Sequence, residues 1–101
     1  MSNPEVDCLG NKYWYNEKRI FHRIDGPAVE YKHGTKEWFF NGKRHRIDGP
    51  AIEYYDGDKC WWIAGKFIYR LYKTGTTDKG DMSNLSKVMK QSIIDEVLKI
   101  E

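Results

Sequence analysis

A seven-residue sequence, HRIDGPA, occurs twice in this chain and constrains its fold more than any other feature. It spans His22–Ala28 and recurs without change at His45–Ala51. A G-x-K-x-W pattern precedes each copy and occurs a third time, beginning at Gly10, Gly34 and Gly57. Self-similarity at 23 or 24 residues is typical of a repeat array, in which each unit packs only against its neighbours.

The third unit is incomplete, as expected for the end of an array. Tyr69 and Arg70 stand where His and Arg stand in the first two units, and no DGPA follows them. One extra residue before Phe21 explains the longer first interval. These intervals predict a repeat domain over residues 1–73, with units over about 9–33, 34–56 and 57–73.

Each unit carries the signals of short β-strands joined by tight turns. The aromatic segment Lys36–Phe40 is followed by Asn41-Gly42, and other strand-like segments end at Asp56-Gly57. Asn-Gly and Asp-Gly favour hairpin turns because a type I′ turn needs positive φ at both central residues. The pattern predicts a mainly β fold, an antiparallel hairpin meander of about eight strands.

The last 29 residues differ in composition, since all fifteen aromatic residues lie between Tyr13 and Tyr72. We predict a polar linker over residues 74–82 and an amphipathic helix over residues 83–101, capped by Ser83 or Asn84. Its apolar side chains recur at steps of three and four residues: Leu85, Val88, Met89, Ile93, Val97 and Ile100, widened by Ile94 and Leu98. This stripe packs on its own sheet or on a partner; the sequence leaves both open.

Composition excludes several functional classes. A net charge of +2 is too small to indicate a nucleic-acid-binding protein by itself. No apolar segment has the length of a membrane span, and MSNPEVD lacks the features of a signal peptide. Two cysteines supply neither a disulfide framework nor a four-ligand metal site. We therefore expect a cytoplasmic protein without metal or cofactor.

The repeated corner residues could be read as chemistry or as structure. His, Arg and Asp could serve as base, anion clamp and orienting group, but a catalytic site is usually built once. Repetition therefore favours a structural role, with Arg paired to Asp and His packed beside Trp. The predicted structural signature comprises His22, Asp25, Gly26, Pro27, His45, Asp48, Gly49 and Pro50, together with the periodic core residues Trp14, Trp38 and Trp61.

The aromatic residues that follow the periodic tryptophans should face the other side of the sheet. Aromatic side chains beside arginine are typical of protein-binding hot spots and of single-strand nucleic-acid surfaces. The predicted contact residues are Tyr15, Phe39 and Trp62 with the once-per-unit arginines Arg23, Arg46 and Arg70.

The pattern W-[FY]-x-N-G-x-x-H-R-x-D-G-P-A resembles MORN-like repeats of the H-R-x-D-G-P-A type over roughly residues 9–73. Proteins of this type look common in tailed phages, giant viruses and some bacteria. The resemblance implies a β-hairpin sheet used as an interaction surface. Tyr69 and Ala64 depart from the repeat, and the lipid-binding MORN pattern Y-x-G-x-x-x-x-G-x-x-x-G is not followed closely.

These observations favour binding without catalysis. Neither a phosphate-binding glycine loop nor a nucleophile elbow is present. We expect a small phage-encoded protein that binds and modulates a host protein, for example by inhibiting a metabolic or defence enzyme. Two alternatives remain: nucleotide or nucleic-acid binding through the aromatic and arginine face, and a structural homo-oligomer.

Overall fold

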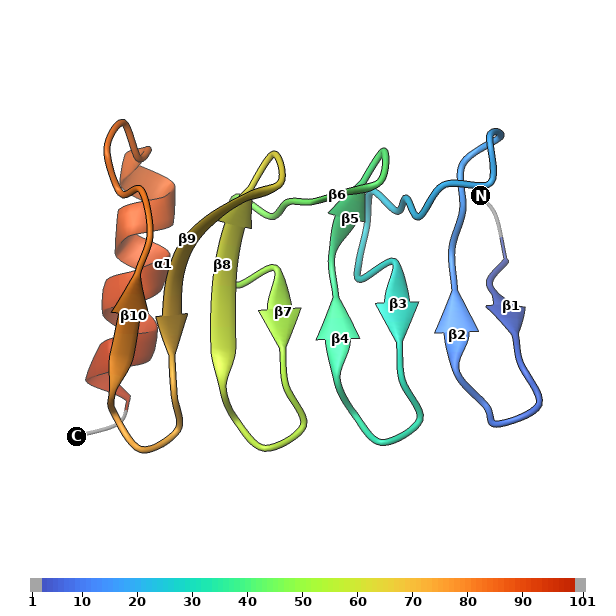
Figure 1. The fold of residues 1–101 in the computed structure, drawn as a ribbon, viewed down its shortest axis with the longest axis horizontal. Helices are drawn as coiled ribbons and strands as arrows, with labels where there is room; N and C mark the ends of the chain where they lie inside the picture. The colour runs from blue at the N-terminus through green and yellow to red at the C-terminus, as the bar shows by residue number, and fades with distance from the viewer. Residues whose placement is uncertain (1–2, 100–101) are drawn as a thin grey trace.

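The computed structural model describes residues 3–99 and confirms the mainly β fold class (Figure 1). Eight strands form one antiparallel sheet in chain order: β1 (Glu5–Val6), β2 (Lys12–Tyr13), β3 (Val29–Glu30), β4 (Lys36–Glu37), β7 (Ile52–Glu53), β8 (Lys59–Ile63), β9 (Lys66–Leu71) and β10 (Thr77–Lys79). A two-stranded sheet, β5 (Phe39–Phe40) and β6 (Lys43–Arg44), lies between β4 and β7 in the chain. One helix, α1 (Lys87–Leu98), follows the last strand.

The predicted strand over Lys36–Phe40 is divided at Trp38. The Trp38 N–H donates to the Ala51 carbonyl at 2.7 Å, whereas its carbonyl accepts from the His45 N–H at 3.2 Å. The chain therefore changes partner strand at this residue, so that β4 belongs to the main sheet and β5 to the small one.

One five-residue turn recurs at the ends of the strands drawn at the bottom of Figure 1, here called the lower edge of the sheet. In Tyr31–Thr35 the Tyr31 N–H donates to the Thr35 carbonyl and the Gly34 N–H to the Tyr31 carbonyl, both at 2.9 Å, with Gly34 at φ 116°. This is a hairpin turn that needs a glycine at the left-handed position. The same pattern of bonds occurs at Asp7–Asn11, Tyr54–Asp58 and Tyr72–Thr76.

The prediction of a linker over residues 74–82 is wrong in part. The fourth lower-edge turn ends at Thr76, and β10 then pairs with β9 in the register Asp78 opposite Arg70. A visible signal was missed, because Tyr72-Lys73-Thr74-Gly75 has the Y-x-x-G spacing of Tyr31–Gly34.

The upper-edge turns agree with the hairpin prediction. Asn41 and Gly42 have φ of 48° and 83°, and Ala64 and Gly65 have φ of 49° and 82°. Both are two-residue turns with positive φ at both positions. The first unit instead has a longer turn with Arg19 at φ 63°, which places the extra residue before Phe21 in a loop.

Side chains bind successive units together at both edges. The Nδ1 atoms of His22 and His45 accept the backbone N–H groups of Asn41 and Ala64, each at 2.9 Å. The lower-edge acceptors are Asn11 Oδ1 for the Lys32 N–H, Thr35 Oγ1 for the Tyr55 N–H and Asp58 Oδ1 for the Lys73 N–H.

The prediction that His22 and His45 pack beside tryptophan is wrong, because both imidazole rings pack against Phe40.

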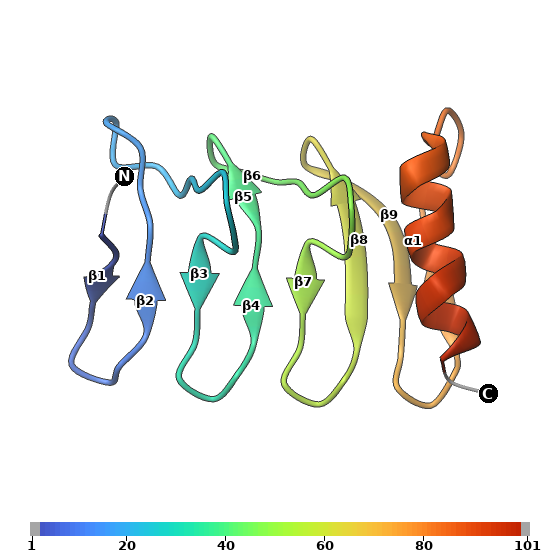
Figure 2. The same ribbon diagram turned by 180° about the vertical axis from the view of Figure 1, so that it is seen from behind.

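Cross-strand pairing defines two faces. The helix face carries α1 and the row Lys12, Glu30, Lys36, Glu53, Lys59 and Leu71, in which the charge alternates as far as Lys59. The open face carries the row Tyr13, Val29, Glu37, Ile52, Cys60 and Arg70. Figure 2 shows α1 in front of β9 and β10, so the helix covers only the C-terminal end of a molecule that is 19 Å thick along its shortest axis.

The largest core cluster lies between α1 and the sheet, so the helix packs on its own chain. Trp61, Ile68, Tyr69 and Leu71 form it with Met89 and Ile93 of α1. A register shift between Trp61 and Trp62 lets the adjacent residues Ile68 and Tyr69 both join the cluster. The Trp61 indole N–H donates to Ser92 Oγ at 2.7 Å.

The helix begins later than predicted. Its N-cap is Ser86, whose Oγ accepts the Met89 N–H, whereas Ser83 and Asn84 belong to a turn in which Asn84 has φ 59°. Ile100 of the predicted stripe lies outside the described residues.

Among residues 3–99, no helix is both long enough and apolar enough to cross a bilayer.

Met89→Ala should destabilise the protein by about 2–5 kcal/mol, because a fully buried side chain leaves a cavity against Trp61. The neighbouring Val88→Ala is the matched control, and since Val88 is exposed it should cost less than about 0.5 kcal/mol. Urea unfolding measures both. Equal losses would contradict the packing of α1 on the sheet.

Candidate functional site

Each complete heptapeptide forms a corner in which an arginine covers a tryptophan. The Arg46 guanidinium carbon lies 4.0 Å from the centre of the Trp38 ring. Its Nε donates to Asp48 at 3.1 Å, and its Nη1 donates to the Pro50 carbonyl at 3.1 Å and to Glu53 at 2.9 Å. The cation is thus stacked and hydrogen-bonded at once.

The first unit repeats the same contacts. Arg23 lies 3.9 Å from the centre of the Trp14 ring and donates to Asp25, to the Pro27 carbonyl and to Glu30 at 3.0–3.2 Å. Hydrogen bonding to Arg23 is the main cause that lowers the pKa of the Asp25 carboxyl. Both arginines are therefore engaged inside their own corners.

The glycine and alanine of the motif follow from this stacking. A Cβ on Gly26 or Gly49 would lie 2.9 or 2.7 Å from the arginine Cζ, so only glycine leaves room for the guanidinium. Ala28 and Ala51 are fully buried, and their carbonyls accept the N–H groups of Trp14 and Trp38. These contacts support the structural interpretation of the signature residues.

The periodic tryptophans are covered to different extents. Trp14 and Trp61 are buried, as predicted, but Trp38 is only partly buried. Trp61 belongs to the unit without a DGPA corner, and there Met89 and Ser92 of α1 take the place of the arginine. Arg46 lies over the ring of Trp38, which also lines an open hollow.

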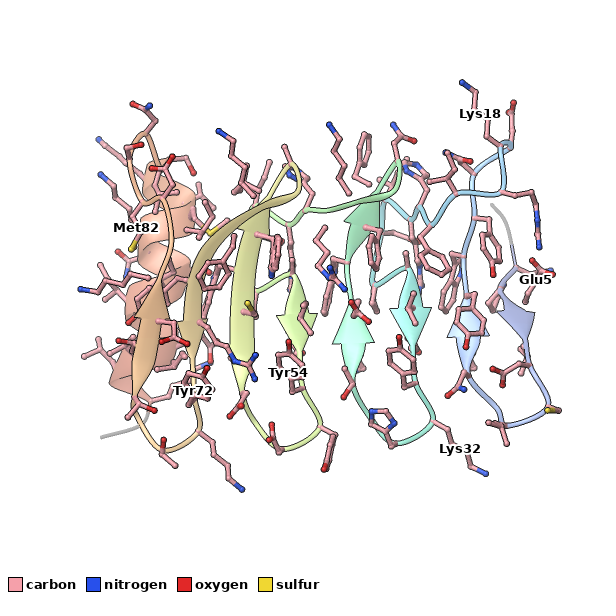
Figure 3. All side chains as sticks on the ribbon, in the orientation of Figure 1. Glu5, Lys18, Lys32, Tyr54, Tyr72 and Met82 are labelled. Atoms are coloured by element: carbon pink, nitrogen blue, oxygen red, sulfur yellow. The ribbon has the colours of Figure 1, made fainter. Side chains whose placement is uncertain are left out.

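Arg70 does not continue the series of Arg23 and Arg46. It lies on the open face, 4.6 Å from the centres of the Tyr54 and Tyr72 rings, and donates to Asp58 at 3.2 Å. Figure 3 shows these two tyrosines on neighbouring hairpins. Tyr69, aligned with histidine in the sequence, is buried and packs edge-on against Trp61. Arg70 therefore lies on the opposite face of the sheet from Arg23 and Arg46.

An aromatic strip crosses the upper part of the open face; it comprises Tyr13, Tyr15, Phe21, Phe39, Arg44 and Trp62. Ring centres of Tyr15 and Phe21, and of Phe21 and Phe39, are 5.3 Å apart. The Arg44 guanidinium carbon then lies 5.3 Å from the Phe39 ring and 5.4 Å from the Trp62 ring. All six side chains are partly buried.

Three predicted contact residues thus belong to one strip, and three predicted arginines lie elsewhere. Tyr15, Phe39 and Trp62 are in the strip, whereas Arg23 and Arg46 are on the helix face. Arg44 was missed. Counting the hairpin register outward from Asn41-Gly42 would have placed it opposite Phe39.

The guanidinium groups of the open face are paired with carboxylates. Arg44 donates to Glu37 at 2.9 and 3.0 Å, and the Tyr31 hydroxyl donates to the other oxygen of Glu37 at 3.0 Å. Burial and the nearby Glu37 raise the pKa of Tyr31 to about 12. Arg19, stacked on Tyr15, pairs with Glu5.

Metal binding and catalysis by a cysteine nucleophile have little support among residues 3–99. No group of three His, Cys, Asp or Glu side chains in this part of the chain is placed to hold a metal ion. Cys8 is exposed at a turn. Cys60 is buried, its sulfur lies 3.1 Å from the Trp62 indole nitrogen, and burial raises the pKa of its thiol. A raised thiol pKa disfavours the nucleophilic thiolate.

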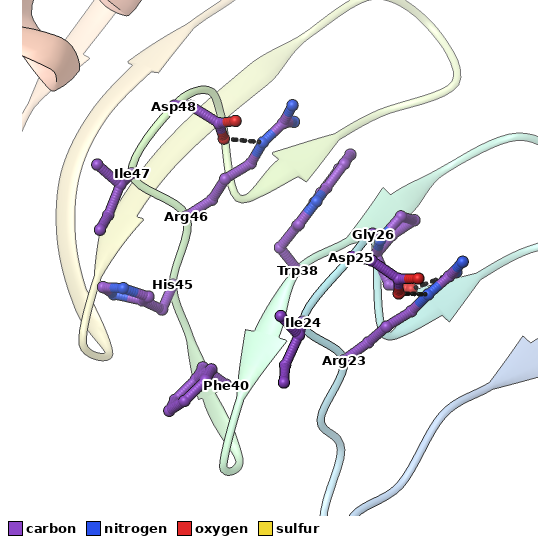
Figure 4. A pocket seen from close by; sticks show the side chains of 11 residues that line it. Arg23, Ile24, Asp25, Gly26, Trp38, Phe40, His45, Arg46, Ile47 and Asp48 are labelled. Atoms are coloured by element: carbon purple, nitrogen blue, oxygen red, sulfur yellow. Dashed lines mark hydrogen bonds and ion pairs between the residues drawn. The ribbon is translucent and has the colours of Figure 1, made fainter. Parts of the chain in front are cut away.

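Two adjacent hollows lie on the helix face. One, of about 630 Å³, lies between the two arginine corners and is lined by Trp38 and Phe40 (Figure 4). The second, of about 490 Å³, lies between the second corner and α1, where Leu85 and Met89 line it. Ile47 and His45 line both.

No protein-family model, curated protein or solved structure gives a significant match to this chain.

Gly49→Ala should cost about 1–3 kcal/mol of stability, because the added methyl group collides with the Arg46 guanidinium. Gly49 does not have a left-handed φ, so backbone strain does not contribute. In an Arg46→Met background the same substitution should cost much less. A double-mutant cycle by urea unfolding measures the coupling, and equal costs in both backgrounds would refute the steric explanation.

The raised pKa of Tyr31 predicts alkaline sensitivity. Folding favours the neutral phenol, so its contribution is complete below pH 10 and is lost as the pH rises from 10 to about 12. Over that range the stability of the wild type should fall more steeply than that of Tyr31→Phe. Unfolding midpoints at successive pH values test this, with Tyr55→Phe on an exposed turn as control. Parallel profiles for all three proteins would contradict the prediction.

Proposed function

We propose that this chain is a non-enzymatic protein-binding module whose contact surface is the aromatic strip. The observation that carries the proposal is the position of α1, which packs on the C-terminal end of the helix face, while no element of residues 3–99 forms a second layer on the open face. Tyrosine, tryptophan and arginine are enriched in binding hot spots because they offer large rigid surface with polar groups.

The strip is preformed. Each ring lies on a hairpin that is bonded to the next unit at both edges of the sheet, as at His22 and Thr35. A rigid surface spends little conformational entropy on binding, so more of the contact energy contributes to affinity. The mechanism is occlusion. The strip covers a surface of the partner, and molecules that normally bind that surface of the partner can no longer reach it.

A protein partner is favoured over a nucleic acid by the pairing of the arginines. Arg44 is held by Glu37 and Arg70 by Asp58. A phosphate would have to displace these carboxylates and would meet their charge. Stacking of bases on the strip is the alternative, and steep weakening of binding with salt is its signature.

The resemblance to MORN-like repeats of phages and giant viruses extends the proposal to the partner. A host protein in the cytoplasm, such as a metabolic or defence enzyme, is the class of target that it favours. Modulation or inhibition follows from occlusion and needs no reacting group in this chain.

Trp62→Ala and Tyr15→Ala should each weaken partner binding by about fivefold or more, since a strip residue of this kind contributes about 1–3 kcal/mol. The partner is first captured from bacterial lysate with the wild type, with and without nuclease, and its affinity is then measured by calorimetry. Tyr55→Ala, which removes an exposed aromatic side chain of a turn outside the strip, is the matched control.

Circular dichroism and urea unfolding confirm that the variants remain folded. If both strip variants bind as tightly as the wild type, the contact surface is not the aromatic strip. If the captured material disappears with nuclease, nucleic-acid binding replaces this proposal.

A further inference from the structure

Exposed apolar side chains gather on the helix face around the first hollow. Ile24 and Ile47 hold the same position in the two heptapeptides and are 84% and 52% exposed. Both line the hollow with Phe40, which is 46% exposed, and the partly buried Trp38 (Figure 4). The arginine corner explains the other positions of the repeat, but nothing in the isolated chain requires isoleucine here.

The helix has a second apolar side on the same face of the molecule. Met89 and Ile93 are buried against the sheet, whereas Val88, Ile94 and Leu98 are exposed. A helix that is apolar on two sides is typical of one that packs between two layers. The chain itself supplies one of those layers.

The dimensions of the hollow and of the helix match. Successive corners are two strands apart, which is about 10 Å at the usual strand spacing. An α-helix with its side chains is about 10–12 Å across. In Figures 1 and 2 α1 runs along the strand direction.

The charges are complementary as well. Asp25 and Asp48 line the first hollow and are 59% and 79% exposed, whereas the arginines that pair with them are each 22% exposed. The exposed charged residues of α1 are Lys87, Lys90 and Asp95, which leave one excess positive charge.

We propose that two copies of this chain associate through their helix faces, with α1 of each copy lying in the hollow between the two arginine corners of the other. A twofold axis parallel to the strands produces both contacts at once, because helix and hollow lie side by side on one face. Ile94 and Val88 of one copy then contact Ile24, Ile47 and Phe40 of its partner. The arrangement gives the first two units the second layer that they lack in the single chain.

Ile47→Asp and Ile94→Asp should each weaken the dimer by about 100-fold or more. Each substitution occurs twice in a symmetric interface and places a charge in an apolar contact. Light scattering after size exclusion, over a range of protein concentrations, measures the effect. Tyr55→Asp, at an exposed turn on the lower edge, is the matched control and should leave the dimer unchanged.

A disulfide trap tests the pairing directly. In a Cys8→Ser background, a chain with both Ile47→Cys and Ile94→Cys should form a covalent dimer under mild oxidation, whereas either substitution alone should not. Cys60 is buried and stays in place. Circular dichroism verifies that all variants are folded.

A wild type that is monomeric at every concentration overturns the proposal, as does a dimer that survives both aspartate substitutions or a trap that forms with one cysteine alone. None of these results touches the open face, so failure here is distinguishable from failure of the proposed function.

Discussion

The stacking of an arginine on a tryptophan is the interaction on which the rest of this structure depends. A sheet of two-residue strands normally needs a second layer to remove its large aromatic side chains from water. Here Arg23 and Arg46 cover Trp14 and Trp38 locally, and each guanidinium has one carbonyl and two carboxylates as acceptors. In the third unit α1 covers Trp61 instead, so the helix is an element of the array and not an addition to it.

This interaction also determines how the two faces differ. The corner directs Arg46 and Glu53 to the helix face, which leaves the open face to the aromatic strip and to Arg44. Glycine at position 49 is a consequence of the same geometry, since the guanidinium occupies the space of a side chain. The constancy of HRIDGPA therefore reflects one set of contacts made twice, and it says little about the partner.

Sequence reasoning succeeded where the information is local. Asn41-Gly42 predicts the hairpin turn, and the alternation of side chains around Trp38 places Phe39 on the opposite face. It failed in the third unit, where the sequence can be aligned with the first two units but the strand register differs. The shift between Trp61 and Trp62 buries Tyr69 and sends Arg70 to the open face, so the third unit is not a copy of the first two. The start of the helix was misplaced because Ser83, Asn84 and Ser86 are all competent caps, and the packing of Met89 on Trp61 decides among them.

The separation of the two faces has a consequence for binding. A dimer formed through the helix faces would turn both aromatic strips outward, on opposite sides of one rigid particle. Two identical sites on one particle increase the apparent affinity for a target that is itself oligomeric or repeated, because the second contact forms at high effective concentration. A repeat array of this size offers only a small contact area per copy, so bivalence is a physical route by which a module of 101 residues could hold such a target tightly.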